Sequence, residues 1–316
     1  MPTGKILILT DGKAGHENQS RAFARALGRD ALTIRVKFRS PFHKALSYLL
    51  DNVGARSQRL FEIQPPDEVP PAEEVCAVVG TGSGTFYAAK TLARRLGVRC
   101  GVVLYPRGYR ISSFDCILAP AFDRPPKAPN VIEIPANLVA NDESFYAEGT
   151  RAFLERHPVA QDVEAVAVIV GGPNKCSTMT AAWMRAELER LFAENAAAQD
   201  GRRREFWVTT SRRTPPDVEA VVDSFPFDYK LIYSRDRFNP IPAFVSLART
   251  LYVTAESTGM LSEACTFGSA EVRVLDNLKP GPHKFRRFAE SCAALGAKKI
   301  DTSGQIAAAR ALLGLG

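Results

Sequence analysis

The chain has 316 residues, of which 46% are hydrophobic and 24% are charged. These values are typical of soluble globular proteins, so they exclude a disordered chain, a fibrous repeat and a small domain stapled by disulfides. The 41 Lys and Arg residues outnumber the 34 Asp and Glu residues, which gives a net charge of +7. This excess suits an anionic ligand, a nucleic acid or an acidic lipid surface without choosing among them.

The cysteines and the N-terminus predict the compartment. The six cysteines form no CxxC pair and four of them lie in or beside apolar runs, so we expect free, reduced thiols. The N-terminus enters a strand-like run at once, and we find no segment suited to a signal peptide or a bilayer span. We therefore expect a cytoplasmic protein, and peripheral attachment to the inner face of the membrane stays open.

Short apolar runs alternate with helix-like stretches along the first half of the chain. The pattern predicts strands at residues 5–10, 32–38, 75–79, 98–104, 116–119 and 131–134. It predicts helices at residues 16–27 and 41–50, after the glycine-rich turn at residues 80–84, and at residues 143–157. Strands separated by helices in this way indicate a parallel sheet with helices on both faces.

After a polar break at residues 158–162 the pattern starts again. Strands are predicted at residues 166–170, 205–210, 231–233, 251–255 and 272–275, and helices at residues 179–195, after Pro215, at 257–267 and at 285–295. The predicted fold class is α/β, with two doubly wound Rossmann-like domains at residues 1–157 and 158–316. The last helix is an element that could pack back on the first domain. A central cleft between the domains is the expected ligand site, because open parallel sheets bind ligands beyond the carboxyl ends of their strands.

The glycine-rich turn at residues 80–84 does not fit a dinucleotide site. The third glycine of a GxGxxG motif would fall on Thr85, and Arg99 and Cys100 stand where a ribose-binding acid is needed. The turn therefore favours a loop that meets an anion or simply reverses the chain.

The loop at residues 10–19 is dense in polar groups and follows the first strand. His16 is the one histidine at such a strand end, and Asp11 and Glu17 are near enough in sequence to orient it as a general base. The alternative is that Asp11 and Asn18 only cap and turn the chain.

The segment at residues 209–214 combines hydroxyls with Arg212 and Arg213 at a strand end before a helix, which predicts a phosphate cradle. The alternative is that Thr214 caps the helix and the arginines are solvated. By contrast, Arg202, Arg203 and Arg204 lie in a turn without interleaved aromatic residues, so no specific nucleic-acid surface is predicted.

The segment at residues 253–263 also joins a strand end to a helix. Backbone amides near Ser257 and Thr258 could meet a diphosphate, and Glu263 could accept hydrogen bonds from ribose hydroxyls. The alternative is that Ser257 only caps the helix and Glu263 lies at the surface.

Four segments together resemble one family, and they occur in its order at residues 9–19, 170–173, 210–215 and 253–264. It is the mitochondrial fission "elongated mitochondria" family, which has plant and many bacterial members. The resemblance implies a GT-B glycosyltransferase-like fold with a nucleotide-sugar site on the second domain. It adds further donor-site residues, namely Gly171, Gly172, Ser211, Asn239, Thr254, Glu256 and Met260. It also implies acceptor-side residues in the first domain, namely Gly12, Gly15, Asn18, Gln19, Gly82, Ser83 and Arg107.

The chain departs from the family pattern mainly on the acceptor side. Ser83 replaces an arginine, Tyr105 replaces the aspartate of an Asp-Pro-Arg motif, and Phe122 replaces the histidine of a His-Asp pair. The loss of that histidine leaves His16 as the candidate base. On the donor side, Glu256 replaces an aspartate and keeps its charge.

The leading hypothesis is a metal-independent glycosyltransferase that moves a sugar from a nucleoside diphosphate to an unidentified acceptor. His16 and Asp11 would be catalytic, Arg212 and Arg213 would neutralise the leaving diphosphate, and no tightly bound cofactor is expected. A membrane-associated acceptor stays open. The alternatives are a non-catalytic adaptor or binding protein on the same scaffold, and a nucleotide-sugar epimerase.

Overall fold

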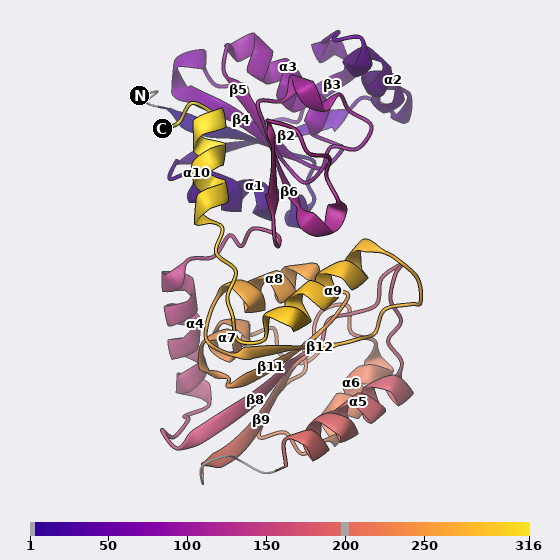
Figure 1. Cartoon of the computed structure of the whole chain (residues 1–316), viewed down its shortest axis with the longest axis vertical. Coiled ribbons are helices and arrows are strands. Elements are labelled where there is room, and N and C mark those ends of the chain that lie inside the picture. Colours follow the sequence, from indigo (N-terminus) through magenta and orange to yellow (C-terminus); the bar gives the residue numbers. More distant parts are fainter. Residues whose placement is uncertain (1–3, 197–201) are drawn as a thin grey trace. The chain divides into compact units, whose positions relative to one another are not determined.

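The computed structural model describes residues 4–196 and 202–316, which divide into two compact units. Unit 1 comprises Met1–Ala140 and Asp301–Gly316, and unit 2 comprises Asn141–Ile300. Figure 1 shows that each unit is a sheet with helices on both of its faces. This arrangement is the predicted α/β fold class, with one doubly wound domain in each unit.

Unit 1 is built around a sheet that has seven strands among the described residues, in the order β3-β2-β1-β4-β5-β6-β7. The strands are β1 (Lys5–Thr10), β2 (Ala31–Phe38), β3 (Phe61–Ile63), β4 (Val75–Thr81), β5 (Arg99–Val103), β6 (Cys116–Pro120) and β7 (Val131–Ile134). The helices are α1 (Ala14–Ala26), α2 (Pro41–Asn52), α3 (Phe86–Leu96) and α10 (Ser303–Leu312). All neighbours pair in parallel except β2 and β3, and the short antiparallel strand β3 was not predicted.

The alternation of side chains along β1 explains how the sheet of unit 1 is covered. Ile6 and Ile8 pack with residues of α1 and α10, whereas Leu7 and Leu9 pack with residues of α3. Successive residues of a strand point to opposite faces, so an uninterrupted apolar run is what a sheet buried on both sides requires. The last helix, α10, lies against β6 and β7 within unit 1.

Unit 2 has five parallel strands among its described residues, in the order β10-β9-β8-β11-β12. The strands are β8 (Val163–Ile169), β9 (Arg203–Thr209), β10 (Tyr229–Leu231), β11 (Thr250–Thr254) and β12 (Glu271–Leu275). The helices are α4 (Glu143–Arg156), α5 (Ala181–Glu194), α6 (Pro216–Ser224), α7 (Ile241–Leu247), α8 (Thr258–Thr266) and α9 (Lys284–Leu295). Helix α7 was not predicted. Pro240 is its N-cap and Pro242 lies in its first turn, where proline is compatible with a helix.

The boundary between the units falls earlier than residue 157, where we expected it. Helix α4 packs on α7, and Phe153 of α4 lies 5.1 Å from Trp207 and 5.9 Å from Phe244, measured between ring centroids. Burial of these rings fixes α4 to unit 2, because each aromatic side chain contributes a large apolar area to the core it joins.

In each sheet, strands are added first on one side of the first strand and then on its other side, so the strand order changes direction once. In unit 1 the chain leaves β1 on one side for β2 and returns on the other side as β4, and in unit 2 the same change separates β8 from β11. The loops that follow these strands separate at the carboxyl edge of the sheet, which is where doubly wound sheets bind ligands.

A buried ion pair fixes α2 to α3 in unit 1. The Lys90 Nζ donates hydrogen bonds to both carboxylate oxygens of Asp51, at 2.8 and 2.9 Å, and both side chains are almost fully buried. Arg56 lies 3.2 Å from the same carboxylate, and the backbone amide of Arg110 donates to it at 2.6 Å. Burial lowers the pKa of Lys90 to about 8, although the hydrogen bonds that Lys90 donates to Asp51 oppose this. Removal of either Asp51 or Lys90 would therefore leave the other group buried without its main partner.

We expect Lys90→Met to reduce the free energy of unfolding by about 3 kcal/mol, because it leaves a buried carboxylate without its main partner. Urea denaturation followed by circular dichroism measures the loss. Lys5→Met at the exposed start of β1 is the control and should change stability by less than about 0.5 kcal/mol. Equal stabilities for the two variants would contradict this role of Lys90.

Candidate functional site

His16 and Asp11 form a hydrogen-bonded pair after β1. The Nδ1 of His16 lies 3.1 Å from Oδ1 and 3.2 Å from Oδ2 of Asp11, and the His16 side chain is 26% exposed. With Nδ1 donating its proton to the carboxylate, Nε2 keeps its lone pair. No other described residue has a hydrogen bond to the His16 ring, so Nε2 is free to accept a proton.

The carboxylate of Asp11 stays ionised beside the imidazole. Burial raises its pKa, but the charge of His16, the backbone amide of Lys13 and the Lys13 ammonium together lower the pKa below its ordinary value. The Lys13 Nζ lies 3.3 Å from Asp11 Oδ2. Asp11 therefore accepts from the Lys13 amide in the turn and also fixes the orientation of the His16 ring, so it does more than turn the chain.

The glycines at residues 80–84 let the β4 loop approach this pair. A Cβ on Gly82, whose φ is +84°, would lie 2.3 Å from Cε1 of His16, and a Cβ on Gly84 would lie 2.8 Å from Oδ2 of Asp11. Only glycine fits such a close approach at a positive φ. The backbone of this loop thus packs directly against His16 and Asp11. This close packing explains the glycines at residues 80–84, and no bound dinucleotide is needed to account for them.

A basic cavity of about 500 Å³ opens beside Asp11 in unit 1. Its polar lining residues are Asp11, Lys37, Arg39, Ser40 and Lys44, and Gly84 closes one side. The Lys44 Nζ donates to Ser83 Oγ at 3.0 Å, so Ser83 is held at this cavity. Sequence reasoning missed the three cations, although they lie around the junction between the predicted strand at residues 32–38 and the predicted helix at residues 41–50.

The other acceptor-side candidates have structural contacts. Gln19 donates to the carbonyl of Leu138 at 2.7 Å and accepts from its amide at 3.1 Å, which ties α1 to the end of unit 1's first segment. Arg107 donates to the carbonyl of Asp123 at 2.8 Å. Phe122, at the place of the family's histidine, is 5% exposed and belongs to the interior.

Three further acceptor-side candidates are exposed, and their surroundings differ. Gly12 has a φ of +79° and lies beside Arg35, while Gly15 and Asn18 are exposed on α1. The structure brings none of the three into the lining of the basic cavity.

In unit 2 a buried carboxylate connects the loops that follow β8, β11 and β12. Glu256 is 3% exposed and accepts hydrogen bonds from the Gly172 amide at 2.7 Å, from Asn277 at 2.8 Å and from the Thr254 hydroxyl at 3.1 Å. The Gly171 amide donates to Thr254 at 2.9 Å. We predicted these residues as ligand contacts, but their polar groups hold one another, because a buried carboxylate must be satisfied by donors.

The glycines after β8 serve the same purpose as those after β4. A Cβ on Gly171 would lie 2.0 Å from Oε1 of Glu256, and a Cβ on Gly172 would lie 2.3 Å from the carbonyl oxygen of Arg213. Thr214 is buried and donates to the Gly171 carbonyl at 2.6 Å. Helix α6 begins after Pro215, so Thr214 does not cap the helix. Its hydrogen bond instead links the loop that carries Arg212 and Arg213 to the loop after β8.

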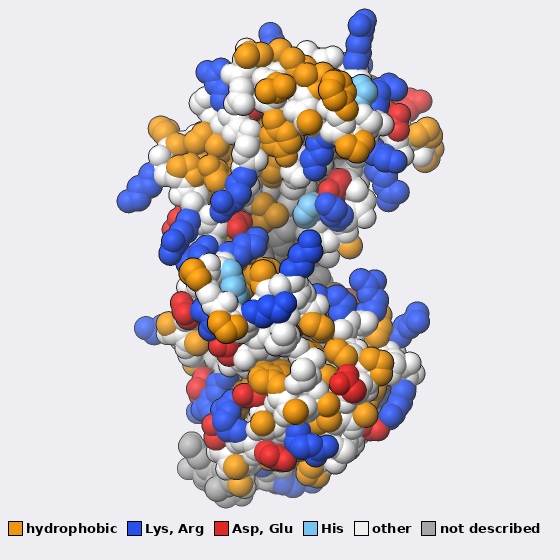
Figure 2. Space-filling model, turned by 90° about the vertical axis from the view of Figure 1, so that its right-hand side faces the viewer, with side chains coloured by type: hydrophobic (Ala, Val, Ile, Leu, Met, Phe, Trp, Pro, Cys, Tyr) orange, Lys and Arg blue, Asp and Glu red, His pale blue; other side chains and the backbone are white. Residues whose placement is uncertain are grey.

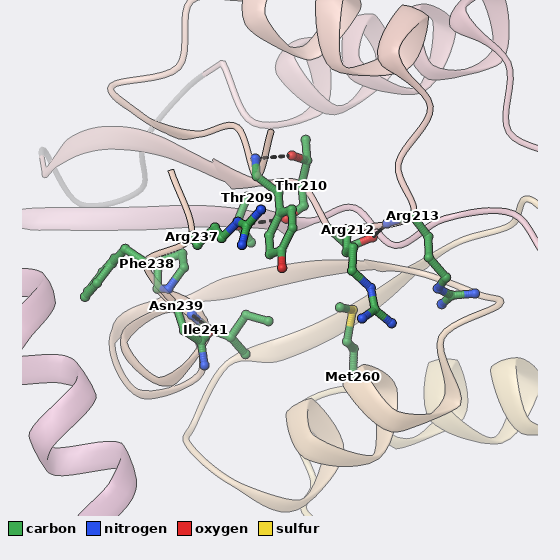
Figure 3. A pocket seen from close by; sticks show the side chains of 12 residues that line it. Thr209, Thr210, Arg212, Arg213, Arg237, Phe238, Asn239, Ile241 and Met260 are labelled. Carbon is green, nitrogen blue, oxygen red and sulfur yellow. Dashed lines mark hydrogen bonds between the residues drawn. The ribbon is translucent and has the colours of Figure 1, made fainter. Parts of the chain in front are cut away.

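A cavity of about 290 Å³ lies next to this network, and we call it the arginine cavity. It is lined by Thr209, Thr210, Ser211, Arg212, Arg213, Tyr233, Arg237, Phe238, Asn239, Pro240, Ile241 and Met260. Figure 3 shows Arg212 extending over Met260 and Arg237 on the other side of the cavity. No described residue forms an ion pair or hydrogen bond with these guanidinium groups or with that of Arg213.

Three arginines without carboxylate partners around one cavity favour an anionic ligand. The sequence had indicated Arg212, Arg213, Ser211, Asn239 and Met260. It missed Arg237, although this residue stands in a charged loop directly after the predicted strand at residues 231–233.

Ser257 and Thr258 lie at the start of α8, where Ser257 is the N-cap and makes no side-chain capping bond. Neither lines the arginine cavity, but Met260 of the same first turn does. The helix N-terminus carries unsatisfied amides and a partial positive charge, so this turn adds to the attraction for an anion.

Glu263 is half-buried on α8 and is not at the free surface. Its Oε1 accepts a hydrogen bond from the Tyr146 hydroxyl at 2.9 Å, and the Tyr146 ring stacks on Phe267 with centroids 4.3 Å apart. Burial raises the pKa of Glu263 above its ordinary 4.5, although the hydrogen bonds from Tyr146 and Asn141 oppose this. Sequence reasoning missed Tyr146, which comes from a helix more than a hundred residues away.

Comparison with known families settles the relationship. The family model of mitochondrial fission ELM1 matches residues 14–310 of this chain. The chain belongs to this family. This confirms the resemblance that the four sequence segments had indicated. No curated protein matches the ELM1-family chain.

Solved structures show which fold the ELM1-family chain shares. A UDP-GlcNAc 2-epimerase from Neisseria meningitidis, bound to UDP-GlcNAc, is 11% identical, covers 98% of each chain and has a TM-score of 0.50. A putative UDP-N-acetylglucosamine 2-epimerase from Listeria monocytogenes is 10% identical, covers 96% of this chain and 94% of that chain, and also has a TM-score of 0.50. An E. coli ADP-heptose heptosyltransferase II is 9% identical and has a TM-score of 0.43. The match covers 92% of this chain and 98% of that chain. The predicted fold, two Rossmann-like domains of the GT-B type, is confirmed.

Within residues 4–196 and 202–316, no three His, Cys, Asp or Glu side chains are grouped so that they could hold a metal ion. In the same ranges no helix has both the length and the apolar character needed to cross a membrane.

We expect Gly82→Ala to disturb His16, because the new methyl group would overlap the imidazole. Gly97→Ala is a matched control, since Gly97 also has a positive φ, of +70°, but no atom lies within 4 Å of its added Cβ. Both variants should lose about 1 kcal/mol of stability from backbone strain, and Gly82→Ala should lose a further 1–3 kcal/mol or displace the His16 ring. Urea denaturation and the His16 NMR signals distinguish the two, and identical behaviour would contradict the close packing.

Glu263→Gln should raise the thermal midpoint at pH 7. A carboxyl group whose pKa is raised in the folded state binds protons more tightly there, so its contribution to stability is lost as pH rises above 4.5. The amide removes this penalty, and the gain should shrink when the melting is repeated at pH 4.5. A gain that is the same at both pH values, or a loss at pH 7, would show that burial of the charge is not the dominant effect.

Proposed function

We propose that this protein is a glycosyltransferase that uses a nucleoside diphosphate sugar as donor. The observation that carries the proposal is the arginine cavity, in which Arg212, Arg213 and Arg237 have no carboxylate partner among the described residues and stand beside the first turn of α8. A diphosphate group matches this site in charge, and guanidinium groups bind phosphate oxygens in pairs. The donor would be held by unit 2, and no tightly bound cofactor is part of the proposal.

Each residue has a distinct task in the proposed transfer. Arg212 and Arg237 would stabilise the negative charge that develops on the diphosphate as the glycosidic bond breaks. The amides of the first turn of α8 would add hydrogen bonds to the same oxygens. Glu263 would accept hydrogen bonds from the ribose hydroxyls, and Tyr146 would hold its carboxylate in place.

The acceptor proton would be taken by His16. Its Nε2 is free, and the imidazolium that forms would be stabilised by Asp11, whose carboxylate lies 3.1 Å from Nδ1. This arrangement resembles the way a carboxylate orients a catalytic histidine in hydrolases.

A second candidate is a nucleotide-sugar-binding protein without transfer activity. It is favoured by the acceptor side, where Phe122 is buried in the interior in place of the family's histidine and Ser83 is held by Lys44. Such a protein would bind the nucleotide sugar at the donor site but would not transfer the sugar. An epimerase on the same scaffold is the third outcome that product analysis would reveal.

Nucleotide binding tests the donor site. Nucleoside diphosphates and their sugars should raise the thermal midpoint, because ligands that bind only the folded state stabilise it. Arg212→Ala should weaken the binding about tenfold or more, since each charge-assisted hydrogen bond contributes about 1.5–3 kcal/mol. Arg202→Ala, at an exposed arginine before β9, is the matched control and should leave the binding unchanged.

His16→Ala separates the base from the donor site. It should retain the wild-type affinity for the nucleotide and lose transfer by about a hundredfold or more. A transferred sugar supports the leading proposal, an isomerised donor supports the epimerase, and binding without product supports the binding protein. The absence of any midpoint shift with all nucleotides at millimolar concentration would overturn the donor site.

A further inference from the structure

Helix α2 exposes an apolar face that the rest of the fold does not use. Of the four large hydrophobic side chains that the described residues expose, three lie on α2 or at its C-cap. Phe42 is 70% exposed, Leu49 is 67% exposed and Val53 is 77% exposed. Figure 2 faces the side of unit 1 that carries α2 and shows hydrophobic side chains gathered there, with Lys and Arg side chains beside them.

These residues lie in one stripe along the helix. At about 100° per residue, an arc of roughly 80° contains four exposed apolar residues, namely Phe42, Ala45, Leu49 and Val53. We call them the α2 face. Such a stripe is the usual pattern of a helix that buries one side, but here it points away from the core.

The opposite side of α2 explains why this stripe stays outward. Ser47 and Asp51 are fully buried, and Asp51 is held by Lys90 at 2.8 Å. Leu46 and Leu50 pack against the core of unit 1. The helix therefore cannot rotate to bury the α2 face without breaking the ion pair, so the face is a fixed feature of the surface.

Cations stand at both ends of the α2 face. At the N-terminal end Lys37, Arg39 and Lys44 line the basic cavity. At the C-terminal end the Arg110 guanidinium lies 3.9 Å from the place of a Cβ on Gly54, the residue after Val53.

Acidic groups near the α2 face are few and engaged. The one carboxylate on α2, that of Asp51, is buried in its ion pair. Glu62 lies 3.9 Å from Arg39 and also accepts from Gln64 at 2.7 Å. Asp11 lines the basic cavity, and its carboxylate lies 3.1 Å from His16 Nδ1 and 3.3 Å from Lys13 Nζ. The surface around the face is therefore apolar along its centre and positive at its ends.

We propose that the α2 face docks unit 1 on a bilayer that contains anionic lipids. An apolar helical stripe flanked by Lys and Arg is the pattern by which interfacial helices enter the boundary between headgroups and acyl chains. Each cation near an anionic surface strengthens such binding about fivefold. The inference does not depend on the proposed function. If that function holds, the basic cavity beside Asp11 would receive the anionic headgroup of a lipid acceptor.

A second copy of the chain fits the α2 face less well. One helical stripe of four residues is small beside the roughly 800 Å² per partner that a stable dimer buries. In a symmetric contact the face would meet itself, and the cations at its ends would meet cations. Anionic headgroups would neutralise the same charges.

Vesicle cosedimentation tests the proposal with the full-length protein. We expect binding to phosphatidylcholine vesicles that contain roughly one-third phosphatidylglycerol, and at least fivefold weaker binding to pure phosphatidylcholine. The double variant Phe42→Ser with Leu49→Ser should bind the anionic vesicles at least tenfold more weakly, because it removes two exposed apolar side chains. Leu247→Ser, at an exposed leucine on α7 in unit 2, is the matched control and should bind like the wild type.

The charges are tested separately. Lys37→Gln with Arg39→Gln should reduce binding to anionic vesicles at least fivefold. Lys5→Gln with Arg94→Gln removes the same charge from exposed positions away from the face and should change binding by less than twofold. Nucleotide midpoint shifts should persist in all of these variants, which separates a failure of docking from a failure of the donor site.

Two results would overturn the docking proposal. One is wild-type binding that is absent or equal on both kinds of vesicle, or unchanged in the Phe42 and Leu49 double variant. The other is a concentration-dependent dimer in solution that this double variant converts to a monomer, which would assign the α2 face to a second copy.

Discussion

Both candidate sites depend on the parallel pairing of one central pair of strands in each unit. In unit 1 the partners are β1 and β4, with Leu9 opposite Gly80, and in unit 2 they are β8 and β11, with Ile169 opposite Val253. Parallel strands end at the same edge, so the loops after them meet wherever the chain changes direction. Asp11 and Gly84 meet in this way in unit 1, and Gly171 and Glu256 meet in this way in unit 2.

Close approach of backbone and side chain is the second constraint that the two sites share. In unit 1 the imidazole of His16 rests on Gly82, and in unit 2 the carboxylate of Glu256 rests on Gly171. In each case the position of a polar side chain is set by the absence of a Cβ on the neighbouring loop. A glycine pattern after a strand can thus serve the protein's own polar groups as readily as a phosphate.

The charges of unit 2 divide into satisfied and unsatisfied groups, and this division separates architecture from binding. Glu256 is buried and has a donor on each side, so it organises loops and has little capacity left for a ligand. Arg212 and Arg237 line a cavity and have no carboxylate partner in the part of the chain that the structure describes. Because an unpaired cation near a cavity gains most from an incoming anion, the arginines are the groups that we propose for binding, whereas Glu256 supports the loops around them.

The sequence by itself determined most of the elements, the fold class and part of the lining of the arginine cavity. Apolar runs such as residues 5–10 must be strands buried on both faces, and strands alternating with helices must form parallel sheets. Ser211, Arg212 and Arg213 were found because they follow a strand end, a local signal.

Only the tertiary structure decided which polar groups meet. Gly172, Thr254 and Glu256 read as ligand contacts in sequence, but folding brings them within hydrogen-bonding distance of one another. Tyr146 and Glu263 are far apart in the chain, and Arg237 joins the cavity through a loop without a motif. The outward turn of α2 likewise follows from a buried ion pair between two helices. Such pairings depend on distances across the fold, and periodicity and local motifs carry information only about neighbours in the chain.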